Sequence, residues 1–229
     1  MNDIIISLKN IRKSFLREKG GDSPNFVLKG LDLEVRKGEF ISIHGKSGSG
    51  KTTLLNITAG LMEPDAGLVK FEGKNLYSLS DYKRSFVRNR KMGFIFQQFF
   101  LIPAIKVREN IMLPGMIAKI GKKELMKRID EVLEILDLKH LAEYYPFTLS
   151  GGQQQRVAIG RAILMKPAVL LCDEPIANLD PESSEKIVSI FKNLSLNEKV
   201  AIIVVSHQHS IDNVADTRYL LKDGKLEKC

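Results

Sequence analysis

The chain contains little cysteine, no tryptophan and no long apolar run. Cys172 lies within an apolar run and Cys229 at the C-terminal end, so the two cysteines do not form a disulfide framework, and we expect a reducing compartment. The longest apolar runs, such as VAIIVV at residues 200–205, are far shorter than the roughly 20 residues that a membrane-spanning helix requires. The first residues also lack the pattern of a secretory signal. A role at a membrane is therefore expected to depend on a partner.

Positive charge is in excess but is not concentrated in one segment. The 229 residues include 35 Lys and Arg against 27 Asp and Glu, a formal net charge of +8. Because the basic residues are spread along the chain, a lysine-rich solvated exterior is favoured over binding to nucleic acid or to an anionic membrane. The 44% hydrophobic and 27% charged contents are ordinary for a globular protein of one large domain, or of a core with a smaller subdomain.

Apolar patterns predict mixed sheet in the first third of the chain. Residues 4–15 and 25–44 show the alternating or continuous apolar runs of strands. Residues 47–62 contain a helix, and Pro64, Asp65 and Gly67 then signal a turn into a short strand with a hairpin-like return. We expect one embedded helix in this third.

Helices are predicted next, followed by a second alternation of strands and helices. Leu125, Ile129, Val132, Leu133 and Leu136 recur at helical spacing, within a helical region of about residues 100–165. In the last third, strands at 168–172 and 200–206 flank a helix at 181–194, and residues 217–229 form a closing hairpin. This order predicts an α/β fold with a parallel sheet covered on both faces.

The segment GKSGSGKT at residues 45–52 matches the P-loop pattern in full. It follows the apolar run FISIH and precedes a predicted helix, which is the context that the motif requires. Its glycines let backbone N–H groups converge on phosphate oxygens. Lys51 would neutralise the β- and γ-phosphates, and the hydroxyl of Thr52 would bind Mg²⁺. The predicted nucleotide-binding residues are Gly45, Lys46, Ser47, Gly48, Ser49, Gly50, Lys51, Thr52 and Thr53.

Two acids end the buried strand AVLLC and complete this chemistry. Ligands of open parallel sheets lie at the carboxyl ends of the strands, so Asp173 and Glu174 are expected to face the phosphates. Asp173 would hold Mg²⁺, and Glu174 would accept a proton from the attacking water. Alone, the pair could simply favour a helix N-terminus. Beside a P-loop, the catalytic interpretation is the stronger one.

Two further polar residues follow apolar strands. His207 could hydrogen-bond a γ-phosphate or a water, although a lone histidine in such a place is often only a polar residue at a sheet edge. Gln97 could reach Mg²⁺ or the attacking water through its carbonyl oxygen. The adjacent FFLIPAI segment fits either the core or a surface for another protein, and periodicity does not decide between them.

A second glycine-led helix start lies in TLSGGQQQRVAIGRAILM at residues 148–165. Ser150 and Gln153 fit a capping box, and Val157, Ile159, Ile163 and Leu164 are expected to pack inward. Gly151 and Gly152 fill the first turn at a cost of about 1 kcal/mol each relative to better helix formers. This cost suggests that a ligand approaches the backbone amides of these glycines closely. An anion is the ligand that a helix N-terminus favours. The helix of a second subunit could cover the γ-phosphate, but spacing alone leaves that open.

Together these segments resemble a known family. GKSGSGKTT, FQQ, LSGGQQQR, LLCDEP, NLD and SH, in this order, are similar to the ATP-binding subunit of ABC transporters over essentially the whole chain. FQQFFLIP and LSGGQQQRVAIGRAIL look most like the lipoprotein-release and macrolide or peptide exporter branch. Lys46, Thr52 and Gln208 are mild departures from the commonest residues of the family's motifs.

The resemblance implies a head-to-tail dimer that sandwiches two ATP molecules. Each ATP would lie between one P-loop and the other subunit's Ser150, Gly151, Gly152 and Gln153, with Asp180 crossing the interface. Gln97 would link the nucleotide to a transmembrane permease. Phe15 would stack on adenine, with Phe26 as a nearby competitor.

The resemblance also implies a P-loop NTPase core with a mixed sheet, an N-terminal antiparallel β part and a helical signature subdomain. The core would comprise residues 1–96 and 166–229, and the helical subdomain about 97–165. We expect an ATP-hydrolysing subunit with Mg²⁺, peripheral at the cytoplasmic face of the membrane, that drives permease partners and binds no nucleic acid. The alternatives are a non-transport ABC ATPase acting on DNA or as a division scaffold, and a regulatory nucleotide switch with negligible turnover.

Overall fold

A six-stranded mixed sheet forms the centre of the computed structural model, which describes residues 3–16, 25–177, 179–208 and 211–229. The strand order is β10-β9-β3-β8-β7-β6, and all neighbours pair in parallel except the β9–β10 hairpin. The strands are β3 (Phe40–His44), β6 (Met92–Ile95), β7 (Val169–Asp173), β8 (Ala201–Val205), β9 (Thr217–Lys222) and β10 (Lys225–Lys228). The predicted parallel sheet and closing hairpin are confirmed.

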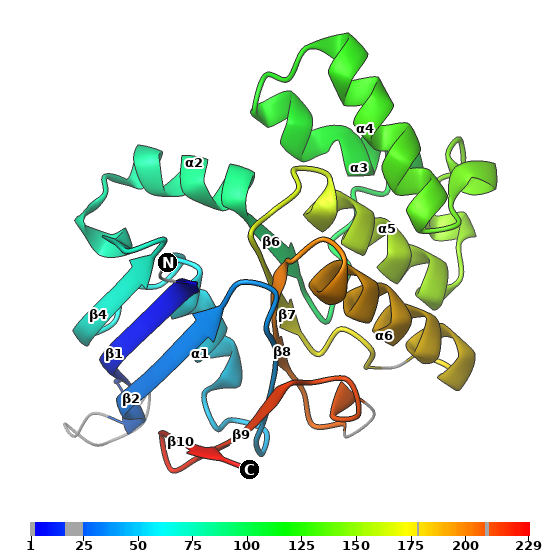
Figure 1. The fold of residues 1–229 in the computed structure, drawn as a ribbon. Coiled ribbons are helices and arrows are strands. Elements are labelled where there is room, and N and C mark those ends of the chain that lie inside the picture. The colour runs from blue at the N-terminus through cyan, green and yellow to red at the C-terminus, as the bar shows by residue number, and fades with distance from the viewer. Residues whose placement is uncertain (1–2, 17–24, 178, 209–210) are drawn as a thin grey trace.

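A second sheet of four antiparallel strands lies beside the first, at the left of Figure 1. Its order is β2-β1-β4-β5, and β1 pairs with both β2 and β4. The strands are β1 (Ile4–Phe15), β2 (Asn25–Arg36), β4 (Ala66–Phe71) and β5 (Lys74–Asn75). This is the antiparallel N-terminal part that the resemblance implied.

Helices cover both faces of the central sheet (Figure 1). They are α1 (Lys51–Thr58), α2 (Asp81–Lys91), α3 (Val107–Ile117), α4 (Lys122–Ile135), α5 (Gly151–Ile163) and α6 (Pro181–Leu196), with short 3₁₀ turns at Leu76–Ser78, Lys139–Leu141 and Pro146–Thr148. On α4 the predicted apolar stripe is buried, including Leu125 and Ile129. None of the helices within the described ranges has the length and apolar character to cross a bilayer.

Alternate residues of the central strands enter two separate cores. Leu170 and Cys172 of β7 pack into a cluster with the helices α3 to α6. Val169 and Leu171 pack on the opposite face, against α1 and the antiparallel sheet. Because side chains alternate along a strand, a sheet covered on both faces needs continuous apolar strands, as the sequence of β7 has.

Helix α2 follows the first third of the chain, in which α1 is the one predicted helix, and α2 itself was not predicted from the sequence. None of its residues is fully buried, although Val87 packs against the core beside the antiparallel sheet. Polar bonds also hold it. Arg88 Nη1 donates to Gly60 O over 2.9 Å, and Arg90 Nη2 donates to Ala118 O over 2.7 Å. These arginines attach α2 to the chain that follows α1 and α3.

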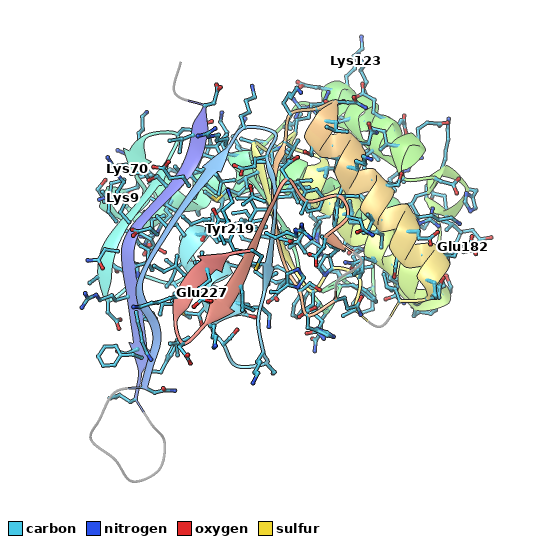
Figure 2. All side chains as sticks on the ribbon, turned by 60° about the horizontal axis from the view of Figure 1, so that its bottom comes forward. Lys9, Lys70, Lys123, Glu182, Tyr219 and Glu227 are labelled. Carbon is cyan, nitrogen blue, oxygen red and sulfur yellow. The ribbon has the colours of Figure 1, made fainter. Side chains whose placement is uncertain are left out.

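Basic side chains are dispersed over the surface. Figure 2 shows Lys9 and Lys70 on the antiparallel sheet and Lys123 at the far end of the molecule, near the start of α4. Glu182 lies on α6, and Glu227 on the C-terminal hairpin. The labelled charges thus lie on widely separated elements, in keeping with a solvated exterior.

Candidate nucleotide-binding site

Four neighbouring parallel strands deliver the predicted site residues to one edge of the central sheet. The P-loop follows β3, Asp173 ends β7, His207 follows β8 and Gln97 follows β6. Since β3, β8, β7 and β6 are adjacent and parallel, their carboxyl ends lie at the same edge. This is where ligands bind in open α/β sheets.

The P-loop backbone takes a shape that requires glycine at two positions. Gly48 has φ 77° and Gly50 has φ 101°, both in the left-handed region. A Cβ at Gly50 would also lie 2.5 Å from Cγ1 of Val27. Gly50 is the residue that precedes the first turn of α1, so the loop ends at a helix N-terminus with free amides.

Lys51 is buried beside the loop that would hold the phosphates. Its Nζ donates to Gly45 O over 2.8 Å and to Lys46 O over 3.2 Å, and the residue is only 9% exposed. A buried ammonium is costly unless it is paired, and these carbonyls only partly compensate its charge. The arrangement therefore favours an anion at the loop.

Asp173 lies directly opposite the P-loop threonine. Thr52 Oγ1 donates to Asp173 Oδ2 over 2.7 Å. Burial raises the pKa of Asp173, the bond from Thr52 lowers it, and the neighbouring charge of Glu174 raises it again, with a net upward shift. A cation beside this carboxylate would offset both the cost of burying its charge and the repulsion from Glu174.

The oxygen donors at this edge fit Mg²⁺. Thr52, Asp173 and Gln97 offer hydroxyl, carboxylate and amide oxygens, which are the hard ligands that Mg²⁺ prefers. No cluster of three or more His, Cys, Asp or Glu residues in the described part of the chain could hold a metal unaided. The ion would therefore share its ligands with nucleotide phosphates and water.

Glu174 is fixed by its neighbours from β8. Its Oε2 accepts bonds from Ser206 Oγ (3.1 Å) and from the His207 amide (3.3 Å), and its Oε1 lies 2.9 Å from His207 Nδ1. Glu174 is buried and has φ 48°, an unfavourable conformation for a residue with a side chain. Such strain is typical of functional sites. No role was predicted for Ser206 from the sequence, and its contact with Glu174 is apparent only in the structure.

A hollow of about 290 Å³ brings most of the predicted residues together. It is lined by Val27, Ser47, Gly48, Gly50, Lys51, Thr52, Thr53, Gln97, Asp173 and Glu174. The P-loop, Gln97 and both acids thus face one space. His207 reaches this space through Glu174.

A second hollow borders the other side of the P-loop, and it separates the two phenylalanine candidates. Phe26, Lys46 and Ser47 are among its lining residues, whereas Phe15 is not. Phe15 is 40% exposed, and Nζ of Lys13 lies 5.8 Å from the centre of its ring. In this structure Phe26 therefore lies closer to the space beside the P-loop.

The helix start at Ser150 has the predicted capping box. Ser150 Oγ accepts from Gln153 N over 3.3 Å, and Ser150 N donates to Gln153 Oε1 over 2.9 Å. The inward residues of α5 are buried as predicted, namely Val157, Ile159, Ile163 and Leu164. The sequence therefore predicted both the start of this helix and its buried face.

The structure separates the two glycines that follow. A Cβ at Gly152 would lie 2.3 Å from Oγ of Ser183 on α6, so this glycine has a packing reason within the chain. Gly151 is exposed, and a Cβ there would meet only Leu179, at 3.5 Å. Of the two glycines that were predicted to let a ligand approach the backbone closely, Gly151 has the open surface that this requires.

The signature residues Ser150, Gly151, Gly152 and Gln153 do not line the hollow of their own chain. Ser150 and Gly151 are exposed, and neither is among the residues that line it. Asp180 is also exposed, and its Oδ1 accepts from Ser183 N over 2.9 Å at the start of α6. Hydrogen bonds from Ser183 lower the pKa of Asp180. These three residues are therefore accessible at the surface of the chain.

Comparison with known proteins identifies this arrangement. Residues 28–177 match the family described as ABC transporter. The chain belongs to the ABC transporter family. It is 40% identical over its whole length to the lipoprotein-releasing system ATP-binding protein LolD of Saccharophagus degradans, and it covers 99% of that protein. It is 39% identical to the uncharacterized ABC transporter ATP-binding protein YknY of Bacillus subtilis, with 97% of this chain and 95% of that one covered.

Solved structures of the ABC family agree with the fold. The ATP-binding cassette MJ0796, a dimer in a post-hydrolysis state with ADP and Pi, superposes with a TM-score of 0.88 at 38% identity over 97% of each chain. CbiO1 from Clostridium perfringens gives a TM-score of 0.87 at 27% identity, over 99% of this chain and 88% of that one. The chain is an ABC ATPase subunit that binds and hydrolyses ATP.

Proposed function

We propose that two copies of this ABC ATPase close head to tail around two ATP molecules and hydrolyse them to drive a membrane-embedded permease. The head-to-tail dimer is supported by the separation of the predicted ATP-binding residues into two places on the chain. P-loop residues, Gln97, Asp173 and Glu174 line one hollow, whereas Ser150 and Gly151 are exposed and do not line it. The dimeric state of MJ0796 supports this arrangement.

Each residue of the half-site has a chemical role in the proposal. Lys51 and the P-loop amides bind the phosphates, and Gly151 of the other copy approaches the γ-phosphate. Glu174 accepts a proton from the attacking water, held in place by Ser206 and His207. Thr52, Asp173 and Gln97 would hold Mg²⁺, which would supply positive charge to neutralise the phosphates.

We place the permease contact at a third hollow, which we call the Gln97-side groove. It has a volume of about 760 Å³, and its lining residues are Leu61, Ser85, Arg88, Asn89, Met92, Gly93, Phe94, Phe96, Phe100, Pro114, Ile117, Arg161, Ala162 and Met165. Phe100 is 60% exposed and Ile117 is 71% exposed. Exposed apolar side chains around a hollow favour a protein partner. Bound there, the chain would lie at the cytoplasmic face of the membrane.

The transported cargo is proposed from the relatives. LolD proteins are lipoprotein-releasing system ATP-binding proteins, and the match covers both chains almost completely. We infer an exporter-type system of this kind. Its test is the identity of the membrane protein that copurifies with the tagged chain, since a permease of an import system would exclude the inference.

The shared ATP site is tested by mixing two inactive variants. Lys51→Ala removes the phosphate-binding ammonium from one chain, and Gly151→Asp places an anion in the signature of the other. Each variant alone should release little phosphate. A mixed dimer contains one intact site, so an equal mixture should recover about a quarter of the parental rate by subunit statistics. A mixture that forms mixed dimers by native mass spectrometry but stays inactive would contradict the proposal.

A further inference from the structure

Arg161, near the end of α5, donates two hydrogen bonds to the loop that follows Gln97. Its Nη2 donates to Phe99 O over 2.8 Å, and its Nη1 donates to Phe100 O over 2.6 Å. The two carbonyls belong to consecutive residues, so they match the two arms of the guanidinium fork. Bonds from a charged donor are shorter and stronger than neutral ones.

The segment that Arg161 holds is not in a relaxed conformation. Phe100 has φ 46°, which is unfavourable for a residue with a side chain. Its ring packs edge-on against Phe96, with centroids 5.4 Å apart. Arg161 is partly buried, and burial lowers the pKa of its guanidinium, which nevertheless stays charged at neutral pH. The paired carbonyls thus compensate a partly desolvated charge.

A backbone contact ties the same end of α5 to the strand before the loop. A Cβ at Gly93 of β6 would lie 2.6 Å from the carbonyl oxygen of Ala162. Helix α5 therefore touches β6 directly beside Arg161. At its other end, about 15 Å from Arg161 at 1.5 Å per residue, the helix begins at Gly151 after the N-cap residue Ser150.

We propose that Arg161 is a positioning residue that holds the loop after Gln97, so that the Gln97 side chain lies beside Asp173 and Glu174. This inference rests on the role of Gln97 in the proposed function. Arg161 lines the Gln97-side groove and is absent from the residues that line the nucleotide hollow. It acts through Gln97, not on the nucleotide itself.

A double-mutant cycle in the full chain tests this coupling. The four proteins are the parent, Arg161→Lys, Gln97→Ala and the double variant, assayed for phosphate release with ATP and Mg²⁺. Lysine keeps the charge but cannot bond both carbonyls. We expect Arg161→Lys to lower kcat about tenfold, the loss of one charge-assisted bond, with KM for ATP changed less than about twofold.

The decisive comparison is the effect of Arg161→Lys when Gln97 is already alanine. If Arg161 acts through Gln97, the second substitution should lower kcat less than about twofold further, because coupled sites are not additive. The same tenfold loss in both backgrounds would overturn the inference, since it would reveal a general structural effect. If Glu174→Gln failed to abolish hydrolysis, the proposed function would be refuted. The double-mutant cycle could still be interpreted, because it compares kcat values of other variants.

Arg156 provides the matched control on the same helix. It donates through Nη1 to Leu136 O over 2.8 Å, at the end of α4 and away from the Gln97 loop. Arg156→Lys should leave kcat within about twofold of the parent. If Arg161→Lys fails to fold, Arg161→Gln is used in the same cycle, with thermal unfolding measured for every variant. Equal kcat losses for Arg156→Lys and Arg161→Lys would also contradict the inference.

Discussion

Oε1 of Glu174 lies 2.9 Å from Nδ1 of His207, while Oε2 of the same carboxylate accepts bonds from Ser206 Oγ and the His207 amide. Both oxygens of the proposed general base are thus held by residues that follow β8. The backbone of Glu174 is restrained as well. Its amide donates to Val205 O over 2.9 Å, and its φ is 48°. Glu174 and His207 form one unit that two neighbouring strands align.

Removal of the imidazole should impair hydrolysis more than binding. His207→Ala leaves Glu174 with its bonds from Ser206 and the backbone but without its ring partner. We expect kcat to fall about 10²-fold, the lower range for a disturbed acid–base group, with ATP affinity nearly unchanged. Phosphate release and nucleotide titration measure the two quantities. His140→Ala is the control, since His140 is exposed and lies on the surface turn Lys139–Leu141. If His207→Ala had the parental kcat, the claim that Glu174 and His207 act together would be refuted.

Asp173 is expected to destabilise the nucleotide-free fold at neutral pH. Its pKa is raised by burial above the ordinary value of 3.8, so the folded chain binds this proton more tightly than the unfolded chain does. Its contribution to stability is therefore largest at low pH and is lost as pH rises through the raised pKa. Asp173→Asn removes that loss and keeps an acceptor for Thr52. We predict a Tm about 1–3 °C higher at pH 7.5, with hydrolysis abolished.

The pH dependence supplies the control for the Asp173 prediction. The Tm difference between Asp173→Asn and the parent should shrink as pH is lowered below the raised pKa, and it should vanish well below the ordinary value of 3.8, where the carboxyl is protonated in both states. Differential scanning calorimetry across this range measures it. A constant difference would assign the effect to packing instead of charge.

The two signature glycines should respond differently to alanine. Gly152→Ala forces a methyl group against Ser183, and we predict a destabilisation of about 1–3 kcal/mol, or a Tm lower by roughly 3–10 °C. Gly151→Ala has room and should leave Tm unchanged or slightly higher, as alanine is the better helix former. It should nevertheless weaken ATP-dependent dimerisation. Two equal Tm losses would contradict this division of roles.

The Gln97-side groove predicts a variant that separates partner binding from catalysis. Ile117→Glu places a charge on a residue that is 71% exposed at the groove. We expect ATP hydrolysis by the isolated chain to be unchanged and permease binding to weaken at least tenfold, as a buried unpaired charge costs several kcal/mol. Ile135→Glu, on a 53% exposed residue of α4, is the matched control. Equal binding losses from both variants would exclude this groove as the contact.

Motifs with a local mechanism were predictable from sequence alone. The P-loop, the Ser150 capping box and the acids after β7 each depend on residues that lie close together in the chain. Periodicity also predicted α4, because its apolar stripe packs into the core. Local chemistry was therefore sufficient for most of the half-site.

Features that depend on tertiary contacts were not predictable. Helix α2 has no fully buried residue, and its arginines bond to carbonyls that are distant in the chain. Likewise, the contacts of Gly152 with Ser183 and of Arg161 with the Phe99 carbonyl join separate elements.

The roles of the individual site residues stay predictions, including the stacking of Phe15 on adenine and the contact of Gln97 with a permease. The subdomain boundaries near residues 97 and 165 also stay predictions, since residues on both sides of them share one hydrophobic cluster.

The most direct test of the account is the mass of the Glu174→Gln variant with ATP and Mg²⁺. Glutamine preserves the shape of the side chain but cannot accept the proton of the attacking water, so ATP should persist in the closed site. Native mass spectrometry should then show two chains with two ATP molecules, and phosphate release should cease. A single chain that binds ATP and hydrolyses it at the parental rate would contradict both the shared site and the role of Glu174.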